Sequence, residues 1–264
     1  MTLADYFLRP AHWSPAGLSQ LAAALLAYLV LARPDRRRAG LATAAAALLG
    51  LAVASPLAGL RALGLHAAVM VSQLLLVLVV PLFLLPLLPP RWVPDLRSRG
   101  GTLLAWGAGA AAMWAGHFLG AARLSAELAE PICGVTAAPG GWAAALPPAA
   151  LSAVLLLGGL CFAVPVFHPD PARRLPPPRG VGYLFLACVS CTLLGLLVTF
   201  TASSAPPAAI LPLHAPFGAP PLPSRRTDQE LAGMLMWVPG CLLYVTLSAR
   251  LLLGWVDTKR YHHA

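Results

Sequence analysis

The chain has 264 residues, of which 59% are hydrophobic and 10% are charged, and its formal net charge is +9. An ordinary soluble domain is about one quarter charged, and a globule leaves much of its chain facing water. The composition therefore excludes an ordinary soluble domain and predicts an integral membrane protein. The basic residues lie between apolar runs instead of clustering on one segment, so nucleic acid is not an expected partner.

Seven apolar runs follow one another along the chain, and none has Lys, Arg, Asp or Glu in its middle. A membrane-spanning helix needs roughly 20 mostly apolar residues. The runs lack the alternation of barrel strands, and a backbone in lipid must satisfy its own hydrogen bonds. We therefore expect an all-α fold, a single bundle of seven transmembrane helices over residues 1–264, with helices near 16–32, 39–54, 66–88, 102–122, 142–165, 181–203 and 229–253.

The basic residues between these runs alternate from one side to the other. Thirteen of the 18 follow the first, third or fifth run or follow or end the seventh, and the other five, Arg9, Arg61, Arg123, Arg225 and Arg226, fall on the opposite side. Loops rich in Lys and Arg stay in the cytoplasm. This bias predicts an external N-terminus and a cytoplasmic C-terminus in a bacterial inner membrane.

Proline and glycine occur where a membrane bundle tolerates them. Pro81 is expected to kink the third helix and Pro239 the seventh, because proline lacks a backbone N–H. Gly107, Gly109 and Gly116 give the fourth run a face of small residues, which favours close packing of helices.

The segment 228–240 reads Asp-Gln-Glu-Leu-Ala-Gly-Met-Leu-Met-Trp-Val-Pro-Gly. It resembles the last-helix motif of the CtaG-like family of cytochrome c oxidase assembly factors. Two further segments are similar to that family, Ser55-Pro56-Leu57 before the third run and residues 169–174 after the fifth. The resemblance spans roughly residues 15–250, and the seven-helix topology that it implies is the one reached from charge.

The resemblance implies a membrane chaperone of the respiratory chain, which assists copper-centre insertion or holds the copper subunit of cytochrome c oxidase at the outer face. Oxidase subunits or other respiratory-complex membrane subunits would be its partners, in addition to the lipid bilayer. Family members carry paired histidines in the third and fifth helices. Here Val69 and Gln73 stand at the first pair of positions, and Pro148 and Ser152 at the second. None of these four is a good copper ligand.

Other soft or imidazole ligands are expected near the outer ends of the helices. His66 opens the third run, His117 lies near the outer end of the fourth, and Met234 and Met236 follow the start of the seventh. Imidazole and thioether groups suit Cu(I), so these residues are the candidate copper ligands. Met234 and Met236 are two residues apart and face different sides of a helix, so they do not easily share one ion. The alternative is that the methionines pack in the core or in lipid and His117 bonds a backbone carbonyl.

Five other residues are expected to act in structure or in partner contact. Gln73 is polar within the membrane, which fits either a functional group or an interhelical hydrogen bond. Asp228 and Gln229 stand where they can cap the last helix, and a partner contact is the alternative. Trp237 and Pro239 complete the motif of that helix.

A Cys-x-x-Cys pair, Cys188 and Cys191, falls within the sixth run and is interpreted as small apolar filler, with a soft-metal site as the alternative. The sequence has no nucleophile–base pair, Walker loop or Rossmann glycine pattern, so we expect no enzyme. Three hypotheses remain: an oxidase assembly factor, a scaffold or resident subunit of a respiratory complex that binds no metal, and a transporter of a small solute or metal. Transport pathways often carry charged groups within the membrane, and these runs have none.

Overall fold

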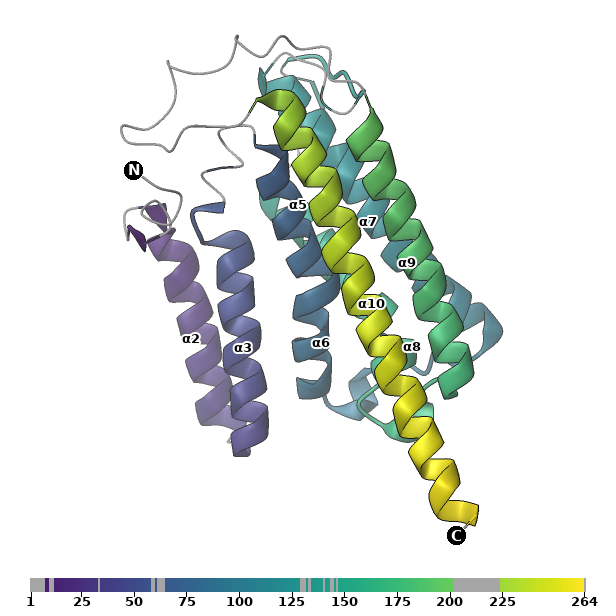
Figure 1. Ribbon diagram of the computed structural model, residues 1–264. Helices are drawn as coiled ribbons and strands as arrows, with labels where there is room; N and C mark the ends of the chain where they lie inside the picture. The colour runs from purple at the N-terminus through teal and green to yellow at the C-terminus, as the bar shows by residue number, and fades with distance from the viewer. Residues whose placement is uncertain are drawn as a thin grey trace.

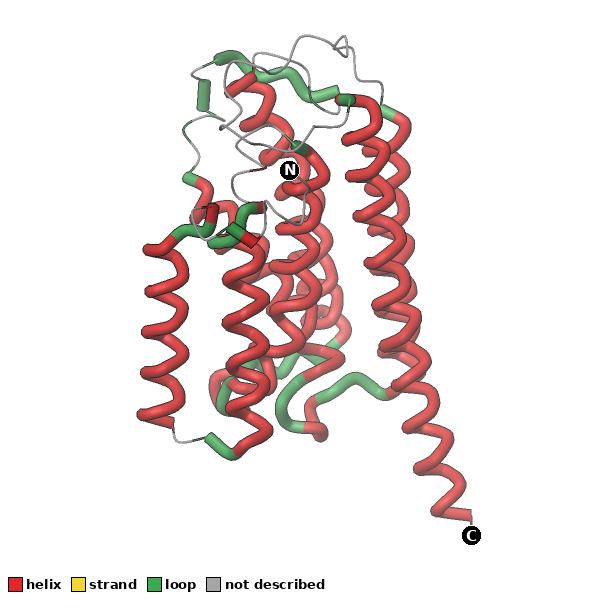
Figure 2. The backbone as a smooth tube through the Cα atoms, turned by 60° about the vertical axis from the view of Figure 1, so that its left-hand side comes forward, coloured by secondary structure: helices red, strands yellow, loops and turns green. Residues whose placement is uncertain are grey.

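The structure is a computed structural model that describes residues 8–9, 12–32, 34–57, 60, 65–128, 132, 134–139, 141–142, 145, 147–201 and 224–263. Within these residues helices are joined by loops (Figure 2), and the one β-bridge is an isolated one between Ile132 and Val135. The all-α prediction is therefore confirmed for this part of the chain. The principal helices are α2 (Pro15–Ala32), α3 (Arg36–Val53), α5 (His66–Leu74), α6 (Val80–Leu84), α7 (Arg99–Leu128), α8 (Pro148–Phe167), α9 (Pro177–Phe200) and α10 (Arg225–His263).

The predicted third helix runs from His66 to Leu87 but changes type along its length. A π-helical segment, Leu75–Val79, joins α5 to α6, and the Val80 N–H bonds the carbonyl of Leu75. Pro81 follows at once, and a proline removes the helical hydrogen bond to the carbonyl four residues earlier, here that of Val77. The distortion expected at Pro81 is thus present as a π-helical turn, wider than an α-helical one, just before the proline.

Successive long helices run in opposite directions (Figure 1). The loops 88–98 and 168–176 and residues 34–35 lie at one end of the bundle, which we call the arginine-rich end. The starts of α5, α8 and α10 lie at the opposite end. Among the described helices the pairing of α9 with α10 is the most extensive, and α2 with α3 forms a pair at one side.

Small residues set the distance between α7 and α8. A Cβ added to Gly109 would come within 2.5 Å of the Phe162 Cβ, and one added to Gly116 within 2.5 Å of Leu155 Cδ2. This confirms the predicted small-residue face for those two glycines. Gly107 is different, since an added Cβ there meets nothing within 4 Å. The prediction was wrong for Gly107, which lies on another side of the helix.

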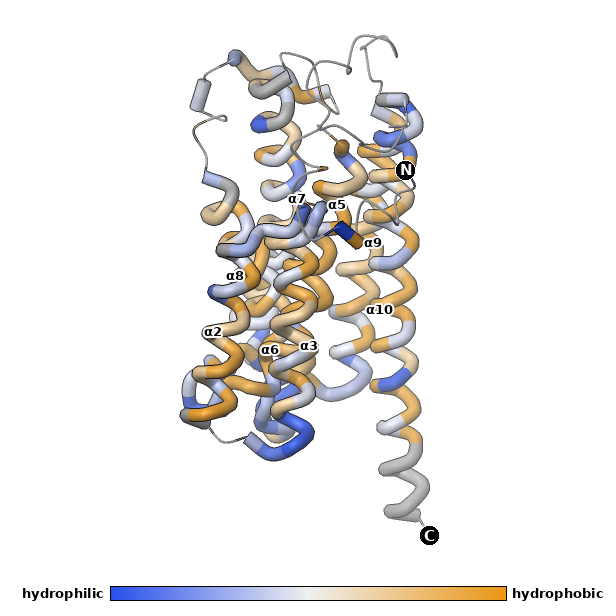
Figure 3. Tube along the Cα trace, turned by 90° about the vertical axis from the view of Figure 1, so that its left-hand side faces the viewer, coloured by the Kyte–Doolittle hydropathy of each residue, from blue (hydrophilic) through white to orange (hydrophobic). Residues whose placement is uncertain are grey.

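Hydropathy along the backbone supports a membrane protein. Apolar residues fill the middle of the bundle and hydrophilic ones gather toward the helix ends (Figure 3). Of the residues that the structure describes, four stretches are long and apolar enough to span a membrane: His66–Leu87, Ala149–Phe167, Pro177–Phe200 and Arg226–Val256. The apolar part of α2, Gly17–Val30, is shorter. These stretches correspond to the predicted third, fifth, sixth and seventh spans.

Candidate functional site

The first turn of α5 is completed by a residue from α10. α5 begins at His66, and the preceding Leu65 supplies no side-chain cap to its unpaired N–H groups. The Asp228 carboxylate takes that place, with Oδ2 2.7 Å from the His66 N and Oδ1 3.1 Å from the Ala67 N. Asp228 is 2% exposed. An anion at a helix N-terminus is also stabilised by the positive end of the helix dipole. The contact therefore fixes the position of the first turn of α5, which carries His66.

His117 comes from α7 and meets His66 at the same end of the bundle. Their ring centroids are 5.2 Å apart, with the planes nearly perpendicular. His117 is 1% exposed, and among the described residues neither of its ring nitrogens has a hydrogen-bond partner. A buried polar group without a partner is costly unless something else binds it. Both residues were predicted near the outer ends of their helices, and the structure places their rings in contact.

Met70 and Gln73 lie on the same face of α5 as His66, because residues at i, i+4 and i+7 share one side of a helix. All three are buried. The Gln73 Nε2 donates to the Gly116 carbonyl at 2.8 Å, next to His117. Met70 was not among the residues that the sequence singled out, although its spacing of four residues from His66 was the signal that could have found it.

The two methionines of α10 point in different directions. Met234 is 53% exposed, whereas Met236 is 1% exposed and packs in the main apolar core. Met236 also lies eight residues beyond Asp228, which is roughly 12 Å along the helix axis from the level of His66. The structure therefore brings His66 and His117 together and leaves Met234 at the surface.

Asp228 and Gln229 cap neighbouring helices. α10 is capped by Ser224, whose Oγ accepts from the Thr227 N at 3.2 Å. The Gln229 Nε2 donates to the carbonyls of Val198 and Thr201 at the end of α9. The expectation that Asp228 and Gln229 cap the last helix is wrong, because α10 starts earlier, at Arg225, and their side chains reach α5 and α9 instead.

Trp237 and Pro239 lie on the surface of α10. Trp237 is 40% exposed, and the exposed side chains around it are apolar, among them Leu231, Val238 and Leu242. Pro239 lies inside the helix. This face is suited to lipid or to another apolar protein surface.

Three cysteines meet between α9 and α10. The Cys188 Sγ lies 2.9 Å from the Cys241 Sγ, and the Cys191 Sγ donates to the Met236 carbonyl at 3.0 Å. All three thiols are free. Over the described residues, no group of three or more His, Cys, Asp and Glu side chains is arranged to hold a metal. Cys191 is fully buried, which fits the interpretation of filler for that residue.

A family model described as the cytochrome c oxidase caa3 assembly factor (Caa3_CtaG) matches residues 22–258. The chain belongs to this family. The match extends from the middle of α2 to near the end of α10, so it includes His66, His117 and the Asp228 motif. Comparison with curated proteins and with solved structures gives no match.

The imidazoles of His66 and His117 are of the ligand type that a soft metal ion prefers. Cu(I) favours imidazole and thioether ligands and accepts few of them. His66 and His117 supply two imidazoles at one end of the bundle, and Met70, one turn further along α5, is buried in the main apolar core. The Val69 position, where the resemblance expects a histidine, carries no ligand atom.

Proposed function

We propose that this protein is a membrane-embedded assembly factor that passes copper to a cytochrome c oxidase subunit, or holds that subunit while its copper centre forms. The observation that supports this role is the buried contact between His66 and His117 within a chain of the caa3 assembly factor family. Copper is the cargo of this proposal, and the protein performs no catalysis.

Seven helices would cross a bacterial inner membrane, with the arginine-rich end in the cytoplasm. The alternating directions of the helices and the gathering of Arg36, Arg37, Arg97, Arg173 and Arg174 at that end support this orientation. His66 and His117 would then lie near the outer face, where an oxidase subunit with an external copper domain could approach them.

The proposed ligands are His66 and His117, with the Met70 thioether as the third. The Asp228 carboxylate acts on the site through the backbone, because it holds the first turn of α5 that carries His66. Gln73 acts in a similar way on α7, because it binds the carbonyl of the residue before His117.

The test is deletion of the gene, followed by measurement of oxidase assembly and of copper per oxidase. We expect both to fall, and plasmid-borne wild-type protein should restore both. A normal oxidase with its full copper content in the deletion strain would reject the assembly role.

Complementation with variants separates copper handling from scaffolding. We expect the double variant His66→Ala/His117→Ala to leave the oxidase short of copper, whereas Met234→Leu, at a lipid-exposed position, should restore it. Each variant must first be shown at the wild-type level in membranes. Full rescue by the double variant would reject the copper site and favour a scaffold or resident accessory subunit that binds no metal.

A further inference from the structure

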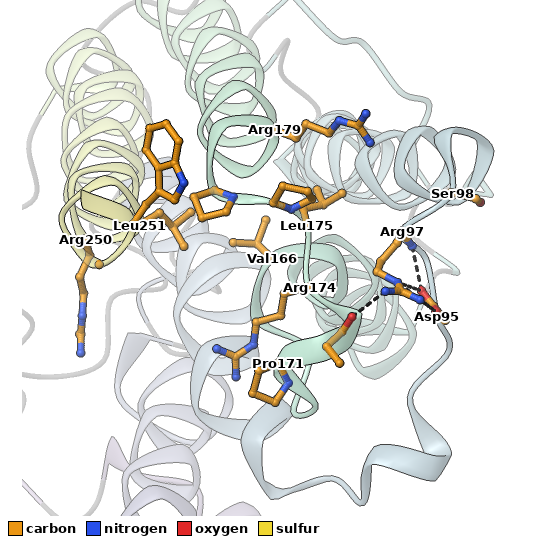
Figure 4. A pocket seen from close by; sticks show the side chains of 15 residues that line it. Asp95, Arg97, Ser98, Val166, Pro171, Arg174, Leu175, Arg179, Arg250 and Leu251 are labelled. Atoms are coloured by element: carbon orange, nitrogen blue, oxygen red, sulfur yellow. Dashed lines mark hydrogen bonds and ion pairs between the residues drawn. The ribbon is translucent and has the colours of Figure 1, made fainter. Parts of the chain in front are cut away.

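A large pocket opens at the arginine-rich end, far from His66 and His117. Its volume is about 1200 Å³, and it lies between the loop before α7, the segment that joins α8 to α9, and the later part of α10 (Figure 4). The charged residues that line it are Arg97, Arg174, Arg179, Arg250 and Asp95. The excess of positive charge makes it suited to an anion.

One of these arginines is already neutralised. Arg97 donates from Nη2 to Asp95 Oδ2 at 2.9 Å and from Nε to both carboxylate oxygens. These hydrogen bonds lower the pKa of Asp95 below its usual value, so Asp95 stays ionised at neutral pH. Arg97 also donates to the Ala172 carbonyl at 2.6 Å, and in this way it fixes the loop that forms one wall.

The other three arginines keep their charge in the pocket. The Arg174 Nε bonds the His168 carbonyl at 2.7 Å, which positions the guanidinium without neutralising it. Arg179 lies in the first turn of α9 and Arg250 lies on α10, and Figure 4 shows their guanidinium groups on opposite sides and pointing away from each other, with Leu175 and Val166 between. The pocket therefore carries positive charge from the α8–α9 segment, from α9 and from α10, and this charge attracts an anion into it.

An apolar groove of about 580 Å³ adjoins this pocket and shares Arg97, Leu175 and Arg179 with it. The groove runs between α7 and α9. Leu103 and Leu186 line it and are 70% and 56% exposed. In a membrane, such a surface faces the acyl chains of lipids.

We propose that the pocket and groove together bind one anionic phospholipid, with its phosphate diester in the pocket that Arg174, Arg179 and Arg250 line and an acyl chain along Leu103 and Leu186. Basic pockets between helices at a membrane surface are suited to such headgroups. A guanidinium group can donate two parallel hydrogen bonds to the oxygens of one phosphate. The continuity of the charged pocket with an apolar groove favours a lipid over a free phosphate ion.

The test uses the full-length protein in nanodiscs of phosphatidylcholine and phosphatidylglycerol in equal amounts, followed by native mass spectrometry of the lipids that it retains. We expect phosphatidylglycerol to be retained preferentially. The double variant Arg179→Gln/Arg250→Gln should lose this preference by roughly fivefold for each charge removed. The matched control is Arg36→Gln/Arg37→Gln, which removes two exposed charges from the same end but outside the pocket, and it should keep the preference.

A charge-preserving variant shows whether a loss of lipid selectivity comes from the lost charges or from misfolding. Arg179→Lys/Arg250→Lys should keep most of the selectivity, since two positive charges remain. Equal retention of both lipids by the wild type, or an equal loss in the pocket and control variants, would overturn the proposal. So would displacement of the lipid by inorganic phosphate at millimolar concentration, because the site would then bind a free anion and the groove would contribute nothing.

Discussion

The side-chain amide of Gln73 donates a hydrogen bond of 2.8 Å to the backbone carbonyl of Gly116, which joins α5 to α7 inside an apolar bundle. A carbonyl has two lone pairs, so Gly116 can accept from Gln73 without losing its own helical hydrogen bond. The contact lies one residue from His117. It therefore stabilises the pair of helices that brings the two histidines together.

Replacement of Gln73 by leucine should destabilise the protein modestly. Hydrogen bonds between transmembrane helices contribute on average about 0.6 kcal/mol and at most about 1.7 kcal/mol. Reversible unfolding in mixed micelles would measure the loss. Thr246→Val is the control, because the Thr246 hydroxyl bonds only the Leu242 carbonyl in the described structure and lies at the surface. Equal losses in both variants would contradict an interhelical role for Gln73.

Replacement of Asp228 by alanine should cost more. It leaves two N–H groups at the start of α5 without their carboxylate, and one orphaned buried donor costs about 1–3 kcal/mol. The control is Glu230→Ala. Glu230 pairs with Arg226 at 2.9 Å on the exposed side of the same helix, and such pairs contribute within about 1 kcal/mol. A thermal shift of the same size in both variants would argue against the capping role.

Alanine at Gly109 should destabilise the contact of α7 with α8. Its Cβ would lie 2.5 Å from the Phe162 Cβ, so one helix must move, and overpacking of this kind costs about 1–3 kcal/mol. Gly107→Ala is the matched control. It has open space and should be neutral or stabilising by up to about 1 kcal/mol, since alanine favours a helix. Unfolding of the two purified variants under the same conditions checks the difference.

The proposed third copper ligand can be separated from the methionine at the surface. We expect Met70→Leu, which nearly conserves volume, to weaken Cu(I) binding about tenfold, equivalent to 1.4 kcal/mol. Met234→Leu should leave the affinity unchanged. Competition with a Cu(I) chelator of known affinity measures both. An unchanged affinity in Met70→Leu would remove Met70 from the site and leave the two histidines.

The thiols of Cys188 and Cys241 should form a disulfide when purified protein is treated with iodine. Their sulfur atoms are 2.9 Å apart, and the reaction converts two thiols and I₂ into one disulfide and two molecules of HI. Peptide mapping by mass spectrometry should find the α9–α10 cross-link. Cys241→Ser should abolish it, while Cys161→Ser should not, because Cys161 lies on α8. A cross-link absent from the wild type would mean that the two sulfurs are farther apart in the protein.

The sequence predicted the helices because hydropathy is a local property. All seven predicted runs correspond to helices, and the arginine pattern agrees with their alternating directions. The π-helical segment Leu75–Val79 was not predicted, because it depends on where the ring of Pro81 meets a backbone that also packs against Gly159. Composition alone also does not fix the number of membrane spans, because α3 and α7 are rich in alanine or glycine.

The candidate site was predicted in part. His66 and His117 were expected at the same end of the bundle, and they are in contact. The side-chain roles of Asp228 and Gln229 were not predicted, because each depends on a helix distant in sequence. A prediction of helix caps from the sequence assumes that a carboxylate near a helix start caps that same helix. The start of α5 has no local side-chain cap, and Asp228 of α10 supplies the acceptor.

The hydrogen bonds between Asp228 and the start of α5 can form only late in synthesis of the chain. The two partners are separated by 162 residues, and a ribosome adds about 5–20 residues per second, so Asp228 is made roughly 8 to 32 s after His66. During that interval the first turn of α5 has no carboxylate and depends on water at the membrane surface. α10, which is made later, therefore completes the start of α5, and a chain truncated before Asp228 would carry its histidines without the contact that holds His66 in place.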